Sequence, residues 1–172
     1  MATNGTVDIK GLENFIKKVE QTLGANQIDS FIESCAKELA ARLLAKVIKR
    51  TPVGEYDKPV NFTTKDGKTV SFTPRTGKKG GTLRRGWTGE KNQGATAYAQ
   101  SLKVKHSGNY YRIEIINPVE YAPYVEYGHR TRDGEGWVEG KFMLTISEQE
   151  LQNDAPRVLE NKLKKKLGEC FR

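Results

Sequence analysis

The sequence has few of the residues from which most catalytic and metal sites are built. It contains only two histidines, His106 and His129, and two cysteines, Cys35 and Cys170. Neither histidine has a second histidine or a cysteine at the spacing of a metal site. No set of reactive side chains converges in the way that an enzyme site requires. We therefore expect no catalytic residue and no metal site.

Long apolar runs are also missing. No stretch approaches the roughly 20 apolar residues that a membrane-spanning helix needs, so no membrane partner is expected. Residues 1–5 are not a charged region followed by an apolar one, and no signal peptide is visible. Because the two cysteines are far apart and Cys35 lies among apolar helix positions, we expect two reduced thiols in a cytosolic protein.

The length of 172 residues suits one domain spanning residues 1–172, with a sizeable core. Hydrophobic residues make up 36% of the chain and charged residues 29%. This composition is polar for a self-contained globule. Three interpretations are open: mobile loops, a flexible arm, or a protomer that its neighbours complete.

Positive charge is in excess and unevenly distributed. The formal net charge is +8. Residues 42–112 contain sixteen basic and four acidic side chains, whereas residues 113–156 contain three basic and nine acidic ones. The basic block could contact nucleic-acid phosphates. Alternatively, faces of opposite sign could fit together in neighbouring copies, which would set their register.

The spacing of apolar residues predicts three helical segments. Residues 8–23 and residues 28–48 each place apolar side chains at a period near 3.6. A closing helix over about residues 141–167 contains Pro156, which should kink or split it.

A β-hairpin is predicted after the second helix. An Asp-Gly pair lies between the β-forming residues 60–64 and 69–73, which is a strong hairpin signal. The basic and glycine-rich residues 75–81 follow. We interpret residues 54–80 as an inserted flexible hairpin loop that projects from the domain.

The remaining pattern predicts a small sheet. Polar and apolar residues alternate over 95–117, which indicates two antiparallel strands with one buried face. Because two strands are marginal alone, we expect a third at about residues 82–88. A short helix over 122–127 and a loop over 128–140 should follow. The predicted fold is α+β: a small antiparallel β-sheet packed against a long N-terminal helix and a C-terminal helix, with a projecting β-hairpin loop.

Three features allow competing interpretations. Residues 77–81 contain glycines and lysines, but the lysines precede the glycines, so a linker is favoured over a phosphate-binding loop. Trp87 could stack on a nucleic-acid base beside the basic stretch, or it could anchor the core. Tyr121, Tyr124 and Tyr127 fall near one face of a short helix, where they could form an interface or pack locally.

Four short motifs follow one another along the chain. They are a Thr-Pro helix end, a Gly-x-Leu-Arg segment ending in Trp, a Tyr-Ala-x-x-Val-Glu-Tyr-Gly turn and a Phe-Met helix start. Their residues are Thr51, Pro52, Gly81, Leu83, Arg84, Trp87, Tyr121, Ala122, Val125, Glu126, Tyr127, Gly128, Phe142 and Met143. Over roughly residues 27–167, their order resembles the tail-completion or head–tail joining proteins of long-tailed bacteriophages and prophages. The chain departs from the family pattern in the insertion after Pro52, in His129 where Thr is common, and in Lys141 where Pro is common.

The resemblance implies a structural virion protein of the phage neck, without catalysis or cofactor. It implies a ring subunit, with six copies to a ring, that joins the head connector to the tail. Partners would be further copies, the neighbouring connector and tail proteins, and by nonspecific contact the DNA passing through the ring. Assembly would take place in the cytoplasm of the bacterial host. A tail terminator, and a nucleic-acid-binding module that uses the basic block, are the alternatives.

The two loops are the expected contact regions. We expect residues 54–80 and 128–140 to contact neighbouring subunits or rings. Gly81 should ease a tight turn into the strand that follows, and Gly128 should allow a sharp turn after the tyrosine-bearing helix. The candidate interface residues are Lys65, Asp66, Lys78, Lys79, Arg130, Arg132 and Trp137.

Overall fold

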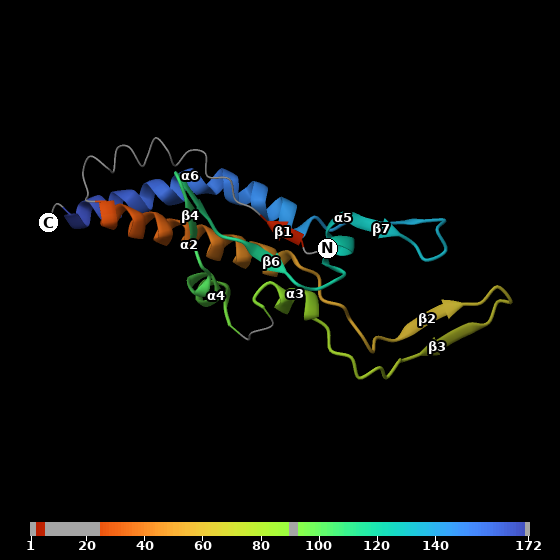
Figure 1. Cartoon of the computed structure of the whole chain (residues 1–172). Coiled ribbons are helices and arrows are strands. Elements are labelled where there is room, and N and C mark those ends of the chain that lie inside the picture. Colours follow the sequence, from red (N-terminus) through yellow and green to blue (C-terminus); the bar gives the residue numbers. More distant parts are fainter. Residues whose placement is uncertain (1–2, 6–24, 90–92, 171–172) are drawn as a thin grey trace.

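Two long helices form the body of the molecule. The structure is a computed structural model that describes residues 3–5, 25–89 and 93–170. Helix α2 spans Ala25–Arg50 and helix α6 spans Met143–Cys170. They lie side by side along the long axis of the molecule (Figure 1).

Short helices and paired strands complete the described part of the chain. The short helices are α3 (Thr82–Gly86), α4 (Ala95–Ser101) and α5 (Ala122–Tyr127). The strands are β1 (Thr3–Gly5), β2 (Val60–Thr63), β3 (Thr69–Phe72), β4 (Lys105–Ser107), β5 (Tyr110–Arg112), β6 (Ile115–Asn117), β7 (Gly128–Arg130) and β8 (Trp137–Glu139). They form antiparallel pairs: β1 with β6, β2 with β3, β4 with β5, and β7 with β8. The predicted α+β class is confirmed.

Helix α2 carries the central apolar face of the core. Its apolar side chains recur at helical spacing, which buries one stripe against α4 and α6. The buried residues of this stripe are Ile28, Phe31, Ile32, Cys35, Leu39, Leu43, Leu44 and Val47. Lys49 and Arg50 lie in the last turn, where cations complement the helix dipole. The predicted helix over residues 28–48 is confirmed, whereas the one over residues 8–23 lies outside the described residues.

Helix α6 packs along α2 through an apolar stripe and ion pairs. The amine of Lys46 lies 3.1 Å from Glu150 Oε2 and 3.2 Å from Asp154 Oδ2, and Arg50 Nη2 lies 2.7 Å from Glu150 Oε1. The hydrogen bond from Lys46 lowers the pKa of Glu150 and raises that of Lys46. Helix α6 continues through Pro156 as one element, so the expected split does not occur.

The predicted third strand at residues 82–88 is wrong, because this segment contains helix α3. Leu83, Gly86 and Trp87 are buried at positions i, i+3 and i+4, which is the spacing of one helical face. Residues 95–101 are likewise helical. Ala95, Tyr98, Ala99 and Leu102 face α2 at i, i+3, i+4 and i+7, and alanine has the highest helix propensity.

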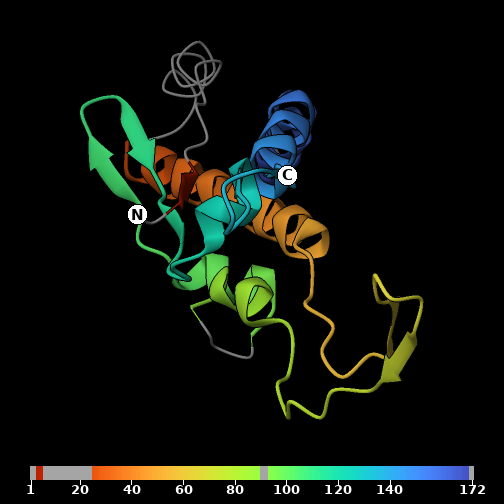
Figure 2. The same ribbon diagram turned by 90° about the vertical axis from the view of Figure 1, so that its right-hand side faces the viewer.

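The remaining hairpin, β4–β5, is shorter and more exposed than predicted. It pairs only residues 105–107 with 110–112 and has no buried residue. The prediction of a sheet with one buried face is therefore wrong here. The hairpin is held to α2 by the hydroxyl of Tyr111, which donates to Asp29. Figure 2 shows β4–β5 on a different side of the helix pair from β2–β3.

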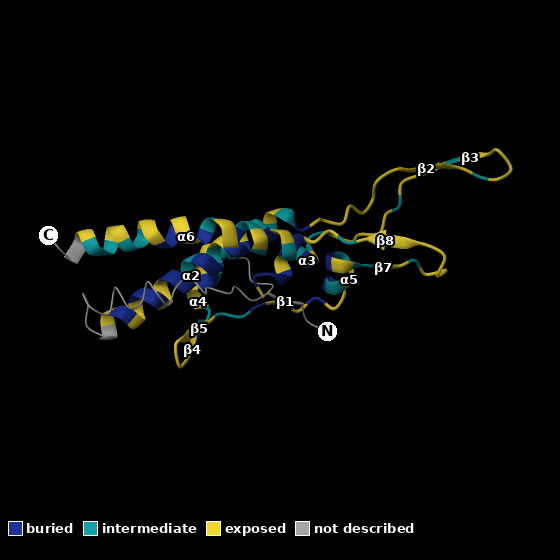
Figure 3. Ribbon diagram, turned by 90° about the horizontal axis from the view of Figure 1, so that it is seen from above, coloured by how far each residue is buried: buried dark blue, intermediate teal, exposed yellow. Residues whose placement is uncertain are grey.

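The segment after α5 is more regular than predicted. Helix α5 is confirmed, with Pro123 in its first turn. Residues 128–140, expected to be a loop, contain the strands β7 and β8. Both β7–β8 and β2–β3 project from the same end of the helix pair (Figure 1), and Figure 3 shows them as mainly exposed.

Candidate functional site

The first two motifs form one hydrogen-bonded unit at the end of α2. Trp87 is fully buried, and its indole Nε1 donates to Thr51 Oγ1 at 2.8 Å. Arg84 donates to the Thr51 carbonyl oxygen through Nε at 3.2 Å and Nη2 at 2.7 Å. The guanidinium thus satisfies a carbonyl at the helix C-terminus, where positive charge is favourable. Because Trp87 is an interior side chain, its suggested stacking on a nucleic-acid base is excluded.

Asn117 fastens α3 to the chain that leads to α5, and sequence reasoning missed it. Its Nδ2 donates to the Leu83 carbonyl oxygen at 2.9 Å, and its Oδ1 accepts from the Val119 N–H at 3.1 Å. A Cβ at Gly86 would lie 2.2 Å from Asn117 Oδ1, so this position of the motif requires glycine. A buried asparagine with both ends of its amide bonded positions two backbone segments at once.

Glu126 caps helix α6 from a distance of 18 residues. Its side chain is completely buried. Oε2 accepts from the Leu144 N–H at 2.9 Å, and Oε1 accepts from Thr145 N–H at 2.9 Å and Thr145 Oγ1 at 2.8 Å. These amide groups have no partner within the helix, and a negative charge there suits the dipole. Through Glu126, the Tyr-Ala-x-x-Val-Glu-Tyr-Gly motif therefore holds the helix start at the Phe-Met motif in place.

The sequence did contain a signal for this contact. The residue before α6 is Phe142, which has no capping oxygen and a positive φ of 45°. No Ser, Thr, Asp or Asn occupies residues 140–142. The first N–H groups of such a helix must find a partner outside the local sequence, either water or a more distant side chain, and Glu126 lies in the adjoining motif.

The two motif glycines occupy backbone conformations that favour glycine. Gly81 has φ 95° and Gly128 has φ 85°. Gly81 precedes helix α3 and not the predicted strand. A Cβ at Gly128 would lie 2.5 Å from the Val138 carbonyl oxygen. The expected sharp turn after the tyrosine-bearing helix is confirmed, and it starts the β7–β8 hairpin.

Residues 54–80, here called the arm, leave and rejoin the body at one point. A Cβ at Gly80 would lie 2.0 Å from the Gly54 carbonyl oxygen, so the two chains touch at the root of the arm. Further out, Asp57 Oδ1 accepts from the Thr76 N–H at 2.6 Å and from Thr76 Oγ1 at 2.8 Å. The bond from the Thr76 N–H is the main reason that the pKa of Asp57 is lowered. Strands β2 and β3 form the tip, as predicted.

Three tyrosines in or directly before α5 are exposed. Tyr121, Tyr124 and Tyr127 have exposed fractions of 45%, 57% and 57%. Local core packing, one of the two interpretations of their spacing, is therefore wrong. Trp137, on β8, has an exposed fraction of 60%. Aromatic side chains exposed on adjoining elements are typical of protein interfaces.

The comparison with known protein families matches residues 13–128 to the HK97-gp10-like family, described as a bacteriophage tail component. This match covers well over half of the chain. The chain belongs to this family of phage tail components. The matched residues include the first three motifs, whereas Phe142, Met143 and the rest of α6 lie beyond them. The searches of curated proteins and of solved structures found no significant match.

In this tail component the candidate interface residues occupy the two hairpins. Lys65 and Asp66 lie in the turn of the arm, where the Gly67 N–H donates to the Thr64 carbonyl oxygen at 2.9 Å. Lys78 and Lys79 lie near its root. The second hairpin carries the rest, and all of the following side chains are exposed: Lys65, Asp66, Lys78, Lys79, Arg130, Arg132 and Trp137. The structure brings them to one end of the molecule but places them on two separate hairpins.

The basic block of residues 42–112 is partly neutralised within the tail component. Among the fifteen basic side chains that the structure describes in this block, six form ion pairs with acidic residues of the same chain. These are Arg42, Lys46, Arg50, Lys58, Lys105 and Arg112. The block is therefore not one continuous basic face.

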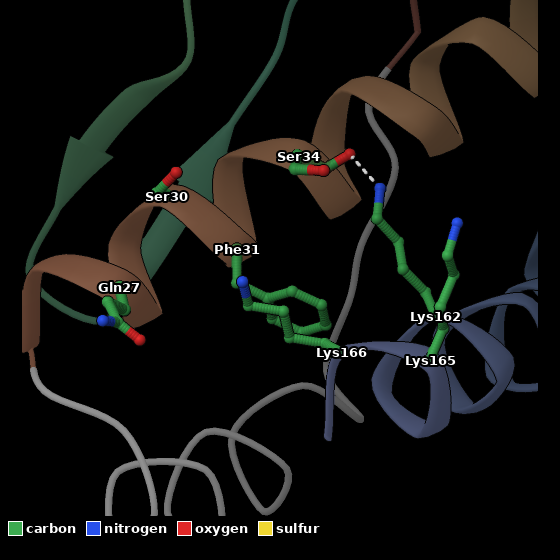
Figure 4. A pocket seen from close by; sticks show the side chains of 7 residues that line it. All are labelled: Gln27, Ser30, Phe31, Ser34, Lys162, Lys165 and Lys166. Carbon is green, nitrogen blue, oxygen red and sulfur yellow. Dashed lines mark hydrogen bonds between the residues drawn. The ribbon is translucent and has the colours of Figure 1, made fainter. Parts of the chain in front are cut away.

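A separate basic pocket lies between the start of α2 and the end of α6, as Figure 4 shows. Its lining residues are Gln27, Ser30, Phe31, Ser34, Lys162, Lys165 and Lys166. Lys162 is already engaged, because its amine donates to the Ser34 carbonyl oxygen at 2.7 Å and lies 2.9 Å from Glu38. Burial alone would raise the pKa of Glu38, but hydrogen bonds from Lys162 and Arg42 lower it.

The described residues contain no group of three or more His, Cys, Asp or Glu side chains that could hold a metal ion. Within the same ranges, neither long helix has a segment apolar enough to cross a bilayer. Cys35 is a core residue, and burial raises the pKa of its thiol to about 11.

Proposed function

We propose that this tail component is a ring subunit at the head–tail junction, where it joins the head connector to the tail and completes tail assembly. The main support is the distribution of exposed apolar side chains. The described residues include fourteen large ones, of which five lie within residues 53–72 and seven within residues 121–146. Exposed apolar surface concentrated in this way marks protein interaction sites. A subunit that is completed by its neighbours would bury this surface on assembly.

The proposed role is structural and not catalytic. In support, the polar members of the motifs form hydrogen bonds within the fold. Arg84 and Trp87 bind Thr51, and Glu126 binds the start of α6. These contacts fix the bases of the two hairpins, so the motifs maintain the position of the projecting segments.

The proposed assembly is a homo-oligomeric ring, with six copies as the family resemblance implies. The neighbours would be head-connector and tail proteins of the virion. DNA passing through the ring would meet basic side chains only by nonspecific contact. The arm supports this picture, because it carries six basic and three acidic side chains on a segment that extends away from the body (Figures 1 and 3).

The test is cryo-electron microscopy of virions that carry a tagged copy of this chain. We expect ring-shaped density between the capsid and the tail tube. Tails purified from cells that make no heads separate the two phage roles, because a terminator would be present on them and a joining protein would not. Absence of the tag from virions, together with DNA binding by the free protein that weakens steeply with salt, would overturn the proposal and favour a nucleic-acid-binding module.

A further inference from the structure

The tip of the arm has one apolar and one polar face. Strand pairing places Val60 opposite Phe72 and Phe62 opposite Val70. Directly opposed residues share a face, and successive residues alternate between faces. These four side chains therefore form one face, and the polar residues Asn61, Thr63, Thr69 and Ser71 form the other.

The arm does not bury this apolar face itself. Val60, Phe62 and Phe72 have exposed fractions of 38%, 48% and 50%. A two-stranded hairpin is only marginally stable alone and needs a further surface to pack against. The arm extends away from the helix pair in both Figure 1 and Figure 3. A partner surface is therefore required outside this body.

A matching surface lies on the same chain, at the same end of the helix pair as the arm (Figure 1). We call it the aromatic surface, and it consists of the exposed side chains of α5, β8 and the start of α6. Its residues are Tyr121, Tyr124, Tyr127, Val138, Phe142 and Ile146. Val138 lies opposite His129 in the strand pair, and the His129 ring contacts Tyr124, so Val138 is on the tyrosine side of the hairpin. The charges around the two surfaces are opposite in sign. The arm has six basic and three acidic residues, all exposed, whereas the exposed charged residues of 120–139 are four acidic and two basic ones.

We propose that the apolar face of the arm docks on the aromatic surface of a second copy of this chain. The inference rests on the proposed function and specifies the contact between ring subunits. The two surfaces differ, so the contact is heterologous: each copy gives its arm to one neighbour and receives an arm from the other. Such contacts repeat, and they close into a ring when the rotation between copies allows it. The opposite charges set the register of the contact.

Docking within one chain is disfavoured by the geometry. The arm and the β7–β8 hairpin leave the same end of the helix pair and stay separate in two perpendicular views (Figures 1 and 3). The root of the arm is fixed by the close approach of Gly54 and Gly80 and by the Asp57–Thr76 contact. The arm therefore presents its tip to a neighbour.

Two double variants test the inference. The arm variant carries Phe62→Ser and Phe72→Ser, and the surface variant carries Tyr124→Ser and Tyr127→Ser. All four side chains are exposed, so both variants should fold, which circular dichroism checks. Tyr110→Ser is the matched control, because Tyr110 has an exposed fraction of 70% but lies on β5. Sedimentation velocity over a concentration series measures association of the full-length protein.

We expect the wild type and the Tyr110→Ser control to self-associate equally. Each double variant alone should associate more weakly by on the order of 10- to 100-fold, because each removes two large side chains from the proposed contact. An equimolar mixture should regain one contact, between the arm of the surface variant and the aromatic surface of the arm variant. The mixture should therefore form dimers and nothing larger.

Three results would overturn the inference: a wild type that stays monomeric at every concentration, double variants that associate like the wild type, or a mixture that behaves like its separate components. Any of these leaves the proposed position in the virion intact if the tagged chain is still found in the neck. Conversely, absence from virions with the mixing result intact would overturn the proposed function alone.

Discussion

Removing the carboxylate of Glu126 should be among the most destabilising single changes in this chain. Glu126→Ala leaves the N–H groups of Leu144 and Thr145 without their acceptor at the start of α6. Each buried donor left without a partner costs about 1–3 kcal/mol, and the lost interaction with the helix dipole adds about 0.5–1 kcal/mol. Because Thr145 is only half-buried and water can reach it, we expect a total near 3 kcal/mol.

The measurement is urea unfolding followed by circular dichroism at constant pH. With a slope of about 2 kcal/mol per molar urea, a loss of about 3 kcal/mol lowers the unfolding midpoint by about 1.5 M. Glu126→Gln keeps one acceptor oxygen and should lose about half as much. Glu120→Ala is the matched control, because Glu120 is exposed on the same segment, and exposed changes usually stay within about 0.5 kcal/mol.

A Glu126→Ala midpoint within error of the Glu120→Ala midpoint would refute the capping role. So would a Glu126→Gln variant as unstable as Glu126→Ala, since that would assign the effect to charge and not to the number of accepted hydrogen bonds.

Three further predictions concern Thr51, Asp57 and Cys35. Thr51→Val removes the acceptor of the buried Trp87 indole and should lower the free energy of unfolding by about 1–3 kcal/mol, whereas Thr51→Ser should be close to wild type. Asp57→Ala should speed tryptic cleavage of the arm without changing the urea midpoint. Because hydrogen bonds from Thr76 lower the pKa of Asp57, the Asp57–Thr76 contact should persist above the ordinary pKa and be lost as the pH falls through the lowered value; cleavage of the arm by pepsin, which is active in acid, measures this loss. Cys35 should not react with a thiol reagent at neutral pH until the chain unfolds, since burial raises its pKa to about 11; rapid labelling of the native protein would contradict this.

The long helices and the arm could be predicted because each has a strong local signal. The apolar stripe of α2 repeats over 26 residues, and an Asp-Gly turn flanked by β-forming residues specifies the tip of the arm. Helix α5 is short, but Pro123 in its first turn and Gly128 at its end define both boundaries. In each case the local preference and the final packing agree.

The secondary-structure predictions that failed concern short segments in which the spacing of apolar residues fits both a strand and a helix. Tyr98 and Leu102 are four apart, which satisfies both an alternating strand and one face of a helix, and the neighbouring alanines decide for the helix. Leu83 and Trp87 have the same spacing and the same ambiguity. In a segment of five to seven residues, contact with α2 selects the conformation, and a single sequence does not show that contact.

The sequence predicted which residues of the candidate site lie on projecting segments, but it did not predict the hydrogen bonds that hold those segments in place. Charge and aromatic spacing placed Lys65, Arg130 and Trp137 on projecting segments. The hydrogen bonds from Asn117 and Glu126, which hold the bases of these segments, join residues 34 and 18 positions apart. Such contacts depend on tertiary geometry, so only the missing local cap of α6 hinted at one of them.

The closed root of the arm makes its length independent of the body. The chain leaves at Gly54 and returns at Gly80 to the same point, and Arg84 fixes the adjoining end of α2. Residues can therefore be added to or removed from the tip without moving either long helix. Each residue added to both strands extends the reach by about 3.3 Å, while the entropy of closing a longer loop rises only slowly. Insertions or deletions at the tip could thus adapt the arm to a neighbour whose contact surface lies at a different distance, while the residues that fold the subunit stay the same.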